Sequence, residues 1–164
     1  MAYVDVPALK RSIVDQLAQV LPDGFDGKPI PIDYAWPGTD KQKPVHVWMF
    51  NATTASEPRG QMAGRKRRDQ TVTLDIVVEV IKQGATVDQS GRNVLQEAVD
   101  AKITEIVGVI DEWIADNPTA GQTSSADVPV DWARFDGWTL EQGVLTGGAS
   151  GRGTVRISIR TFPK

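Results

Sequence analysis

Only one histidine, His46, is available for acid–base or metal chemistry in this sequence of 164 residues, and there is no cysteine. A metal site built on an imidazole needs further histidine, thiolate or carboxylate ligands, and a Ser-His-Asp triad has to use this same histidine. No G-x-S-x-G string or comparable nucleophile setting is present. We therefore interpret His46 as a structural or interface residue rather than a metal ligand or general base.

Carboxylate pairs and glycines provide no catalytic constellation either. Asp111 and Glu112 are adjacent on a predicted helix and diverge, while Asp75 and Glu79 lie four residues apart on one strand face, too far to share a proton. The glycines of 147–153 join two predicted strands, whereas a phosphate-binding loop needs a helix N-terminus directly after it. We interpret the carboxylates as a solvated face. The sequence predicts no enzyme and no cofactor, metal or small-molecule site.

A cluster of basic residues without an intervening acid is the main charged feature, and it comprises Arg59, Arg65, Lys66, Arg67 and Arg68. Residues 1–68 carry a charge balance of +3 and residues 69–164 one of −6. Three interpretations stay open: the cluster contacts nucleic-acid phosphates, it pairs with the acidic half of a neighbouring copy, or it is a solvated loop. The net charge of −3 and the lack of interleaved aromatic residues disfavour a dedicated nucleic-acid binder.

Hydrophobic spacing predicts the elements that position these residues. Apolar residues three and four apart predict a helix over 6–21 and a longer one over 89–116, and strict alternation predicts a strand over 70–82. The second helix, at roughly 40 Å, is longer than a core of this size needs, so we expect part of it to serve an external contact. Further strands are predicted over 45–51, 135–146 and 154–162, with a short proline-limited edge strand near 30–34.

The predicted strands also place several candidate interaction residues. The strand over 45–51 is apolar on both faces, with Trp48 and Phe50 on the face of His46, which indicates cover by its own domain or by a second subunit. Aromatic side chains often anchor interfaces. Arg156 and Arg160 fall on one side of the last strand and predict a basic row on the open face of the sheet.

These elements predict a single α+β domain over 1–164, a four-stranded, mostly antiparallel sheet with two helices packed on one face. We expect exposed loops near 22–44, 52–68 and 117–131, and a flexible hairpin tip at 147–153. No apolar run of signal-peptide or membrane-spanning length occurs, so we expect no membrane contact and synthesis in a cytosol.

The succession of elements resembles the tail terminator family of long-tailed bacteriophages, proteins that cap the finished tail tube and join it to the head. The resemblance rests on the amphipathic opening helix, the strand VHVWMFNA, the basic segment that runs into RRDQTVTLDIVVEV, the long helix and the closing strand GRGTVRISIRTF. It implies a structural virion protein that forms a hexameric ring, assembles in the host cytoplasm and has no catalytic residues.

The resemblance also implies the partners of such a ring: the tail-tube protein, a head-side connector protein and, in passing, the DNA that crosses the lumen. The candidate contacts between subunits or with the lumen are the basic cluster together with Trp48, Phe50, Arg156 and Arg160. Two alternatives stay open. One is another neck or tail-completion connector protein, and the other is a small nucleic-acid-binding module that uses the basic cluster.

Overall fold

The computed structural model describes residues 4–58, 68–85, 87, 89–122, 130–143 and 145–161. Helices and strands are both well represented, which confirms the predicted α+β class. In chain order the elements are α1 (Val6–Leu17), β1 (Ile32–Asp33), the 3-10 turn η1 (Thr39–Lys41), β2 (Val45–Pro58), β3 (Arg68–Gln83), α2 (Val94–Asp116), β4 (Val130–Gly143) and β5 (Gly148–Thr161).

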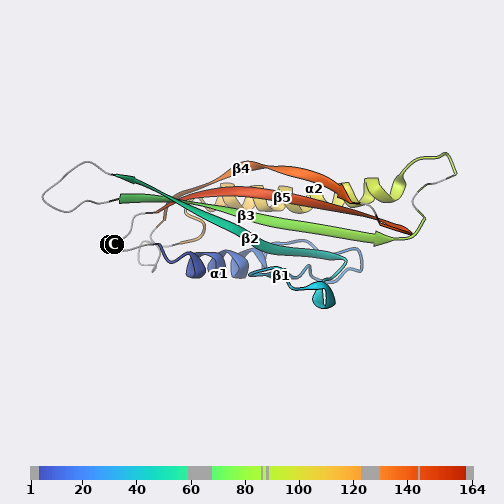
Figure 1. The fold of residues 1–164 in the computed structure, drawn as a ribbon, viewed down its shortest axis with the longest axis horizontal. Coiled ribbons are helices and arrows are strands. Elements are labelled where there is room, and N and C mark those ends of the chain that lie inside the picture. Colours follow the sequence, from blue (N-terminus) through green and yellow to red (C-terminus); the bar gives the residue numbers. More distant parts are fainter. Residues whose placement is uncertain are drawn as a thin grey trace, which may run out of the picture.

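The strands form one mixed sheet in the order β1-β2-β3-β5-β4. The four long strands are antiparallel neighbours and run along the length of the molecule (Figure 1). The two residues of β1 add a fifth, parallel strand beside Val47 and Trp48, so the predicted count of four is too low by one. Prolines on both sides of β1, at positions 29, 31 and 37, keep this strand short because proline cannot donate to a ladder.

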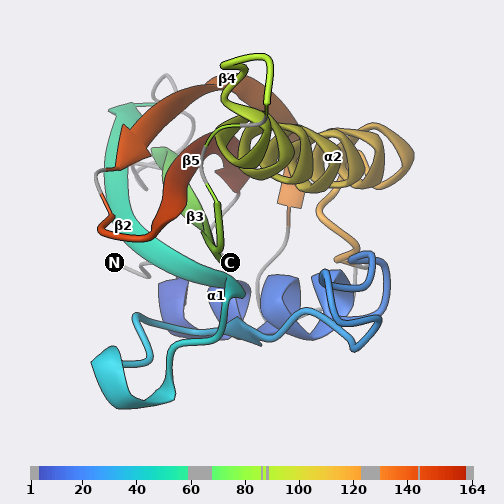
Figure 2. The same ribbon diagram turned by 90° about the vertical axis from the view of Figure 1, so that its right-hand side faces the viewer.

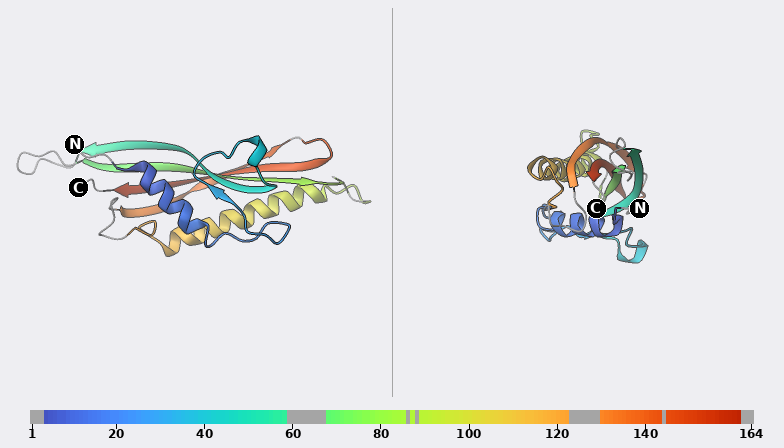
Figure 3. Two further views of the ribbon diagram at one scale, coloured as in Figure 1. Left: turned by 90° about the horizontal axis from the view of Figure 1, so that it is seen from below. Right: turned by 90° about the vertical axis from the view of Figure 1, so that its left-hand side faces the viewer.

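Both helices pack on the concave side of the curved sheet, as predicted (Figures 2 and 3). α1 contacts β1 and β2, whereas α2 lies under β3, β5 and β4. The side chains between the layers are completely buried, and each stabilises the fold by about 1.5–3 kcal/mol relative to an exposed position. They include Leu9, Ile13 and Leu17 of α1, Ile103, Ile106 and Ile110 of α2, and Val72, Leu74, Ile76, Val78 and Val80 of β3.

Both helices are shorter than predicted, because the backbone leaves the helical conformation although apolar residues continue at helical spacing. α1 begins as expected, with the Asp5 carboxylate accepting a hydrogen bond of 3.0 Å from the Ala8 N–H. It ends at Leu17 rather than 21, and Val20 is 42% exposed. α2 begins at Val94 rather than 89, after Gly91 at a φ of 84°. With 23 residues it is about 34 Å long.

The predicted loop over 52–68 is wrong where the structure describes it. Ala52 to Pro58 continue β2, and Arg68 opposite Pro58 already begins β3. A bulge between Met49 and Ala52 precedes this extension. The polar composition of this part of β2 resembles that of a loop because both faces of the strand are exposed to solvent over residues 52–56. Residues 59–67 of the predicted loop lie outside the described part of the chain.

The predicted hairpin tip at 147–153 is also wrong, because β5 begins at Gly148 and its glycines serve packing. A Cβ atom on Gly153 would lie 2.6 Å from Ile103 Cγ2, and one on Gly151 would lie 2.8 Å from Ile103 Cδ1. These glycines therefore let α2 approach the strand closely. The predicted loop near 22–44 is confirmed apart from β1 and η1.

β4 begins at Val130, inside the predicted loop 117–131 and five residues before the predicted strand start. Residues 117–122 form turns, as expected, and 123–129 lie outside the described residues. The strand start was predicted too late because Asp131 and Trp132 follow a Ser- and Thr-rich stretch, whose composition is typical of a loop. Val130 and Trp132 nevertheless pair with β5.

Candidate interaction surface

The convex face of the sheet, which points away from both helices, carries a row of ion pairs between β3 and β5. The antiparallel register places Glu79 opposite Arg152 and Asp75 opposite Arg156, so each pair shares this face. We call the six residues the arginine ladder: Arg152 Nη2 lies 2.8 Å from Glu79 Oε2, Arg156 Nε lies 3.1 Å from Asp75 Oδ1, and Arg160 Nη2 lies 2.7 Å from Asp69 Oδ2.

In the pairs of Arg152 and Arg156 the arginine is exposed and the carboxylate is largely covered, whereas Arg160 is half-buried beside the buried Asp69. The Arg156 side chain is 62% exposed, whereas that of Asp75 is 14% exposed. The hydrogen bond to Asp75, and then the attraction of its charge, raise the pKa of Arg156 above its ordinary value. Arg156 and Arg160 thus lie on the open face as predicted, but the face is a charge-paired ladder rather than a bare basic row.

The carboxylates of the ladder are the residues that sequence reasoning missed. Asp75 and Glu79 were expected to form a solvated face, but they are paired. A signal was present: the two acids are four residues apart on β3, and Arg152 and Arg156 are four residues apart on β5. An antiparallel register that joins one pair must also join the other.

His46, Trp48 and Phe50 lie near one another on β2 but differ sharply in exposure. Trp48 is 2% exposed, stacks edge-on against the His46 ring at 6.1 Å between centroids, and is covered by the Arg152 guanidinium. Phe50 lies in the bulge and is 54% exposed. Of these two aromatic candidates, Phe50 is therefore the one whose side chain reaches the surface of the single chain.

Both ring nitrogens of His46 are engaged in hydrogen bonds. Nδ1 accepts from the Lys43 N–H at 3.1 Å, so the proton resides on Nε2, which lies 2.5 Å from Asp33 Oδ2. The ring is 2% exposed and joins β1 to β2. This arrangement is that of a structural histidine.

Four members of the basic cluster, Arg59, Arg65, Lys66 and Arg67, lie outside the described residues. Arg68 is the first residue of β3, where its backbone pairs with Pro58. The cluster therefore connects the far ends of β2 and β3 along the chain.

Neither a family model nor a curated protein matches this sequence. Within the described ranges, no group of three or more His, Cys, Asp or Glu side chains is placed to hold a metal ion. No helix in this part of the chain is long and apolar enough to span a membrane.

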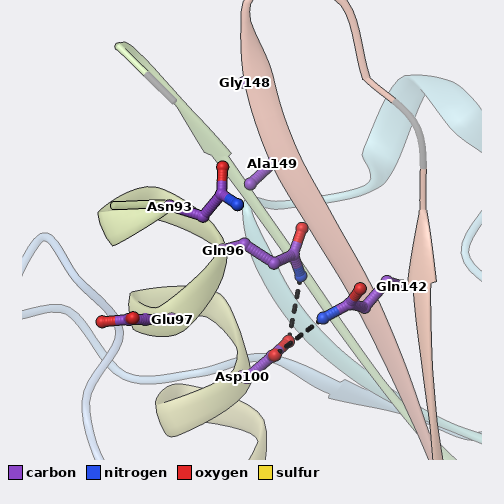
Figure 4. Close-up of a pocket in the computed structure, with 7 residues that line it drawn as sticks. All are labelled: Asn93, Gln96, Glu97, Asp100, Gln142, Gly148 and Ala149. Atoms are coloured by element: carbon purple, nitrogen blue, oxygen red, sulfur yellow. Dashed lines mark hydrogen bonds between the residues drawn. The ribbon is translucent and has the colours of Figure 1, made fainter. Parts of the chain in front are cut away.

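A polar groove of about 350 Å³ lies between the start of α2 and the β4–β5 turn (Figure 4). The Asp100 carboxylate accepts a hydrogen bond of 2.9 Å from Gln96 and one of 3.0 Å from Gln142. Gln96 also donates to the Ser150 carbonyl at 3.1 Å. Since both carboxylate oxygens of Asp100 are occupied, these side chains brace α2 against the two strands.

The solvent side of α2 is acidic. Lys102 is the one basic residue among its 23 positions, and it is bound to Glu105 at 2.9 Å. The other carboxylates follow the helix along its whole length, and they are Glu97, Asp100, Asp111, Glu112 and Asp116. This acidic face belongs to the half of the sequence with the negative charge balance.

Two long strand edges have no neighbouring strand among the described residues. β1 covers only Val47 and Trp48 of β2, which leaves the edge of β2 open from Met49 to Pro58. β4 is the last strand on the opposite side and has β5 as its one neighbouring strand among the described residues, and its outer edge is occupied near its start, where the Ala133 N–H donates to the Pro118 carbonyl at 2.6 Å. Long open edges are normally blocked or used for association, because their backbone groups can pair with another chain.

Proposed function

We propose that this chain is a structural virion protein, a tail terminator that closes the tail tube of a long-tailed bacteriophage and joins it to the head-side connector. Six copies form a ring stacked on the last ring of tail-tube protein, and DNA passes through the lumen. The order of elements supports the proposal, since a long strand, a long helix and a closing strand follow the opening helix and VHVWMFNA strand in one α+β fold.

The observation that carries the proposal is the pair of unlike open edges. A closed ring of identical copies needs two different, complementary surfaces on each copy. The β2 edge from Met49 to Pro58 and the β4 edge lie on opposite sides of the sheet. If the β2 edge of one copy pairs with the β4 edge of the next, the sheet continues around the ring and both sets of backbone groups are satisfied.

The uneven charge of the chain gives this contact a direction. The acidic face of α2 lies in the half with a balance of −6, and residues 1–68 have a balance of +3. Opposite charges on adjoining copies steer encounter and register, while buried apolar contacts and strand pairing hold the ring together.

Mass photometry and negative-stain microscopy of the purified full chain test the assembly. We expect ring-shaped particles of six subunits, alone or after addition of purified tail tubes, with the rings at tube ends. A monomer at high concentration in the presence of tubes contradicts the proposal.

A matched pair of variants tests the β2 edge. Phe50→Glu puts a charge on an exposed aromatic residue in the β2 bulge, and we expect it to abolish rings while the melting temperature of the monomer is kept. Val20→Glu changes a residue that is 42% exposed just beyond α1 and belongs to neither edge strand, and it should leave rings intact. Equal effects of the two variants contradict the role of the edge.

A phage lacking this gene separates the proposed role from its alternatives. A terminator predicts full heads with overlong or unjoined tails, whereas tails of normal length that fail to join assign the chain to a connector. Salt-dependent binding of duplex DNA that disappears in the double variant Arg65→Ala and Arg67→Ala instead assigns it to a nucleic-acid-binding module.

A further inference from the structure

A cleft beside the start of β2 has an apolar floor. Two adjoining hollows of about 350 and 500 Å³ share Phe25, Lys43 and Pro44 in their linings. Ile30 lines the first hollow and Ile81 the second. The Phe25 side chain lies between them and is 42% exposed. Hollows of this size accept bulky side chains of a ligand.

Lysines surround this floor without ion-pair partners. Lys28, Lys43 and Lys82 all line the cleft, and no carboxylate of the described chain lies within 4.0 Å of their ammonium groups. The ammonium group of Lys82 is 4.2 Å from the centroid of the Phe25 ring. The acid in the lining, Asp26, accepts a hydrogen bond from the Lys28 N–H. The rim therefore differs from the arginine ladder, where every guanidinium has a carboxylate.

A free strand edge completes the cleft. β2 begins at Val45 opposite Val80, whereas β3 continues to Gln83, which still pairs with Gly148 of β5 (Figure 1). The Ile81 N–H donates to the Pro44 carbonyl at 2.7 Å, and the chain of β2 goes no further along this edge. Backbone groups alternate in direction along a strand, so those of Lys82 face β5 and those of Gln83 face the open edge beside the cleft, to which an extended peptide can add.

We propose that this cleft binds an extended acidic segment of a partner protein. One bulky apolar side chain of the segment packs against Phe25, its carboxylates face Lys28, Lys43 and Lys82, and its backbone pairs with the end of β3. The three features select a peptide, since a nucleic acid offers charge for the lysines but no strand for the edge. The proposal does not depend on the ring.

Fluorescence anisotropy with the full chain tests the binding. The probe is a fluorescein-labelled peptide Asp-Glu-Leu-Phe-Asp-Glu, with two comparison peptides in which serine replaces the phenylalanine or lysine replaces all four acids. We expect the probe to bind at least tenfold more tightly than either comparison peptide, and more weakly as salt rises from 50 to 500 mM. Equal binding of all three peptides overturns the proposal.

Variants locate the binding on the protein. We expect Phe25→Ser, and the double variant Lys43→Glu and Lys82→Glu, each to weaken probe binding at least tenfold. Lys41→Glu, an exposed lysine of η1 outside the lining, and Phe50→Ser are the matched controls and should bind as the unchanged chain does. A control that weakens binding as much as its partner overturns the assignment to the cleft.

Two further measurements guard against misinterpretation. If Phe25→Ser unfolds the chain, the binding of the probe and of the serine-containing peptide is measured on the Phe25→Leu variant, which keeps an apolar side chain at this position. Amide resonances of Lys82 and Gln83 should shift when the probe binds. If an equal concentration of duplex DNA displaces the probe, and the amide resonance of Gln83 does not shift when the probe binds, the proposal of a bound peptide is overturned. The lysines are then assigned to the binding of phosphate groups.

Discussion

Two glycines of β5 set the distance between the sheet and α2. Gly153 faces Ile103, and no side chain fits between them. Gly108, on the solvent side of the same helix, has open space where a Cβ atom would be added. The two positions therefore respond in opposite directions to the same substitution.

We expect Gly153→Ala to lower the free energy of unfolding by about 1–3 kcal/mol, because the new methyl group displaces Ile103 and the helix that carries it. Gly108→Ala should raise it by about 1 kcal/mol through better helix propensity. Urea unfolding followed by circular dichroism measures both. A neutral or stabilising Gly153→Ala contradicts the close packing.

Lys10 is a buried cation without a carboxylate partner in the described chain. Its side chain is 8% exposed, with the ammonium group 3.4 Å from the Phe50 carbonyl oxygen and 4.3 Å from the centroid of the Tyr34 ring. Burial lowers the pKa of Lys10 below its ordinary value of 10.5.

This lowered pKa gives stability a defined pH dependence. Between the folded pKa of Lys10 and 10.5, the unfolded chain binds more protons than the folded chain, so stability rises with pH in that window. Below it, the cost of burying the charge is fully present. We expect Lys10→Met to remove this rise, as measured by the difference between the two proteins in urea unfolding from pH 8 to 10.5. Parallel profiles contradict it.

At the scale of elements, the arginine ladder joins the two central strands at regular intervals. Each pair is partly exposed, and such pairs contribute only about 0.2–1 kcal/mol. Their greater effect is on register, since a one-residue slip of β5 against β3 removes every pair at once and turns the core residues outward.

A double-mutant cycle on Glu79→Gln and Arg152→Gln measures one pair. We expect a coupling of about 0.2–1 kcal/mol that decreases from 50 to 500 mM salt. The same cycle on Asp111 and Arg152, which no contact joins, is the control and should give additive effects. A coupling free energy of zero at low salt contradicts a stabilising interaction between Glu79 and Arg152.

Strong periodicity made some elements predictable, and composition misled where periodicity was absent. The alternation predicted β3 over 70–82, and it spans Arg68–Gln83. Thr53 and Thr54 were assigned to a loop, yet they pair with β3 in an exposed ladder, where no buried face creates alternation. The glycines of β5 imitate a flexible turn, because a short sequence window does not contain the helix that packs on them.

The candidate interaction surface was also predictable only in part. Alternation placed Arg156 and Arg160 on the open face, but their partners depend on a register between strands some 80 residues apart. The Phe25 cleft could not be predicted, because it forms only when the proline-rich segment returns beside the end of β3.

At the scale of the whole molecule, the open edges of β2 and β4 connect stability with assembly. If these edges join copies, folding and association are linked, and the melting temperature depends on protein concentration. We expect it to rise between about 1 and 100 μM for the unchanged chain and to stay constant for Phe50→Glu. Differential scanning fluorimetry and calorimetry cover this range, and a concentration-independent transition in the unchanged chain contradicts the linkage.

The position of β5 between β3 and β4 has a consequence for synthesis on the ribosome. Asp75 of β3 precedes its partner Arg156 by 81 residues, so β3 leaves the exit tunnel long before the strand that completes it. At roughly 5–20 residues per second, the nascent hairpin of β2 and β3 waits about 4–16 s with one bare, valine-rich edge. During that interval the growing chain is most exposed to aggregation, and a holding chaperone benefits it most.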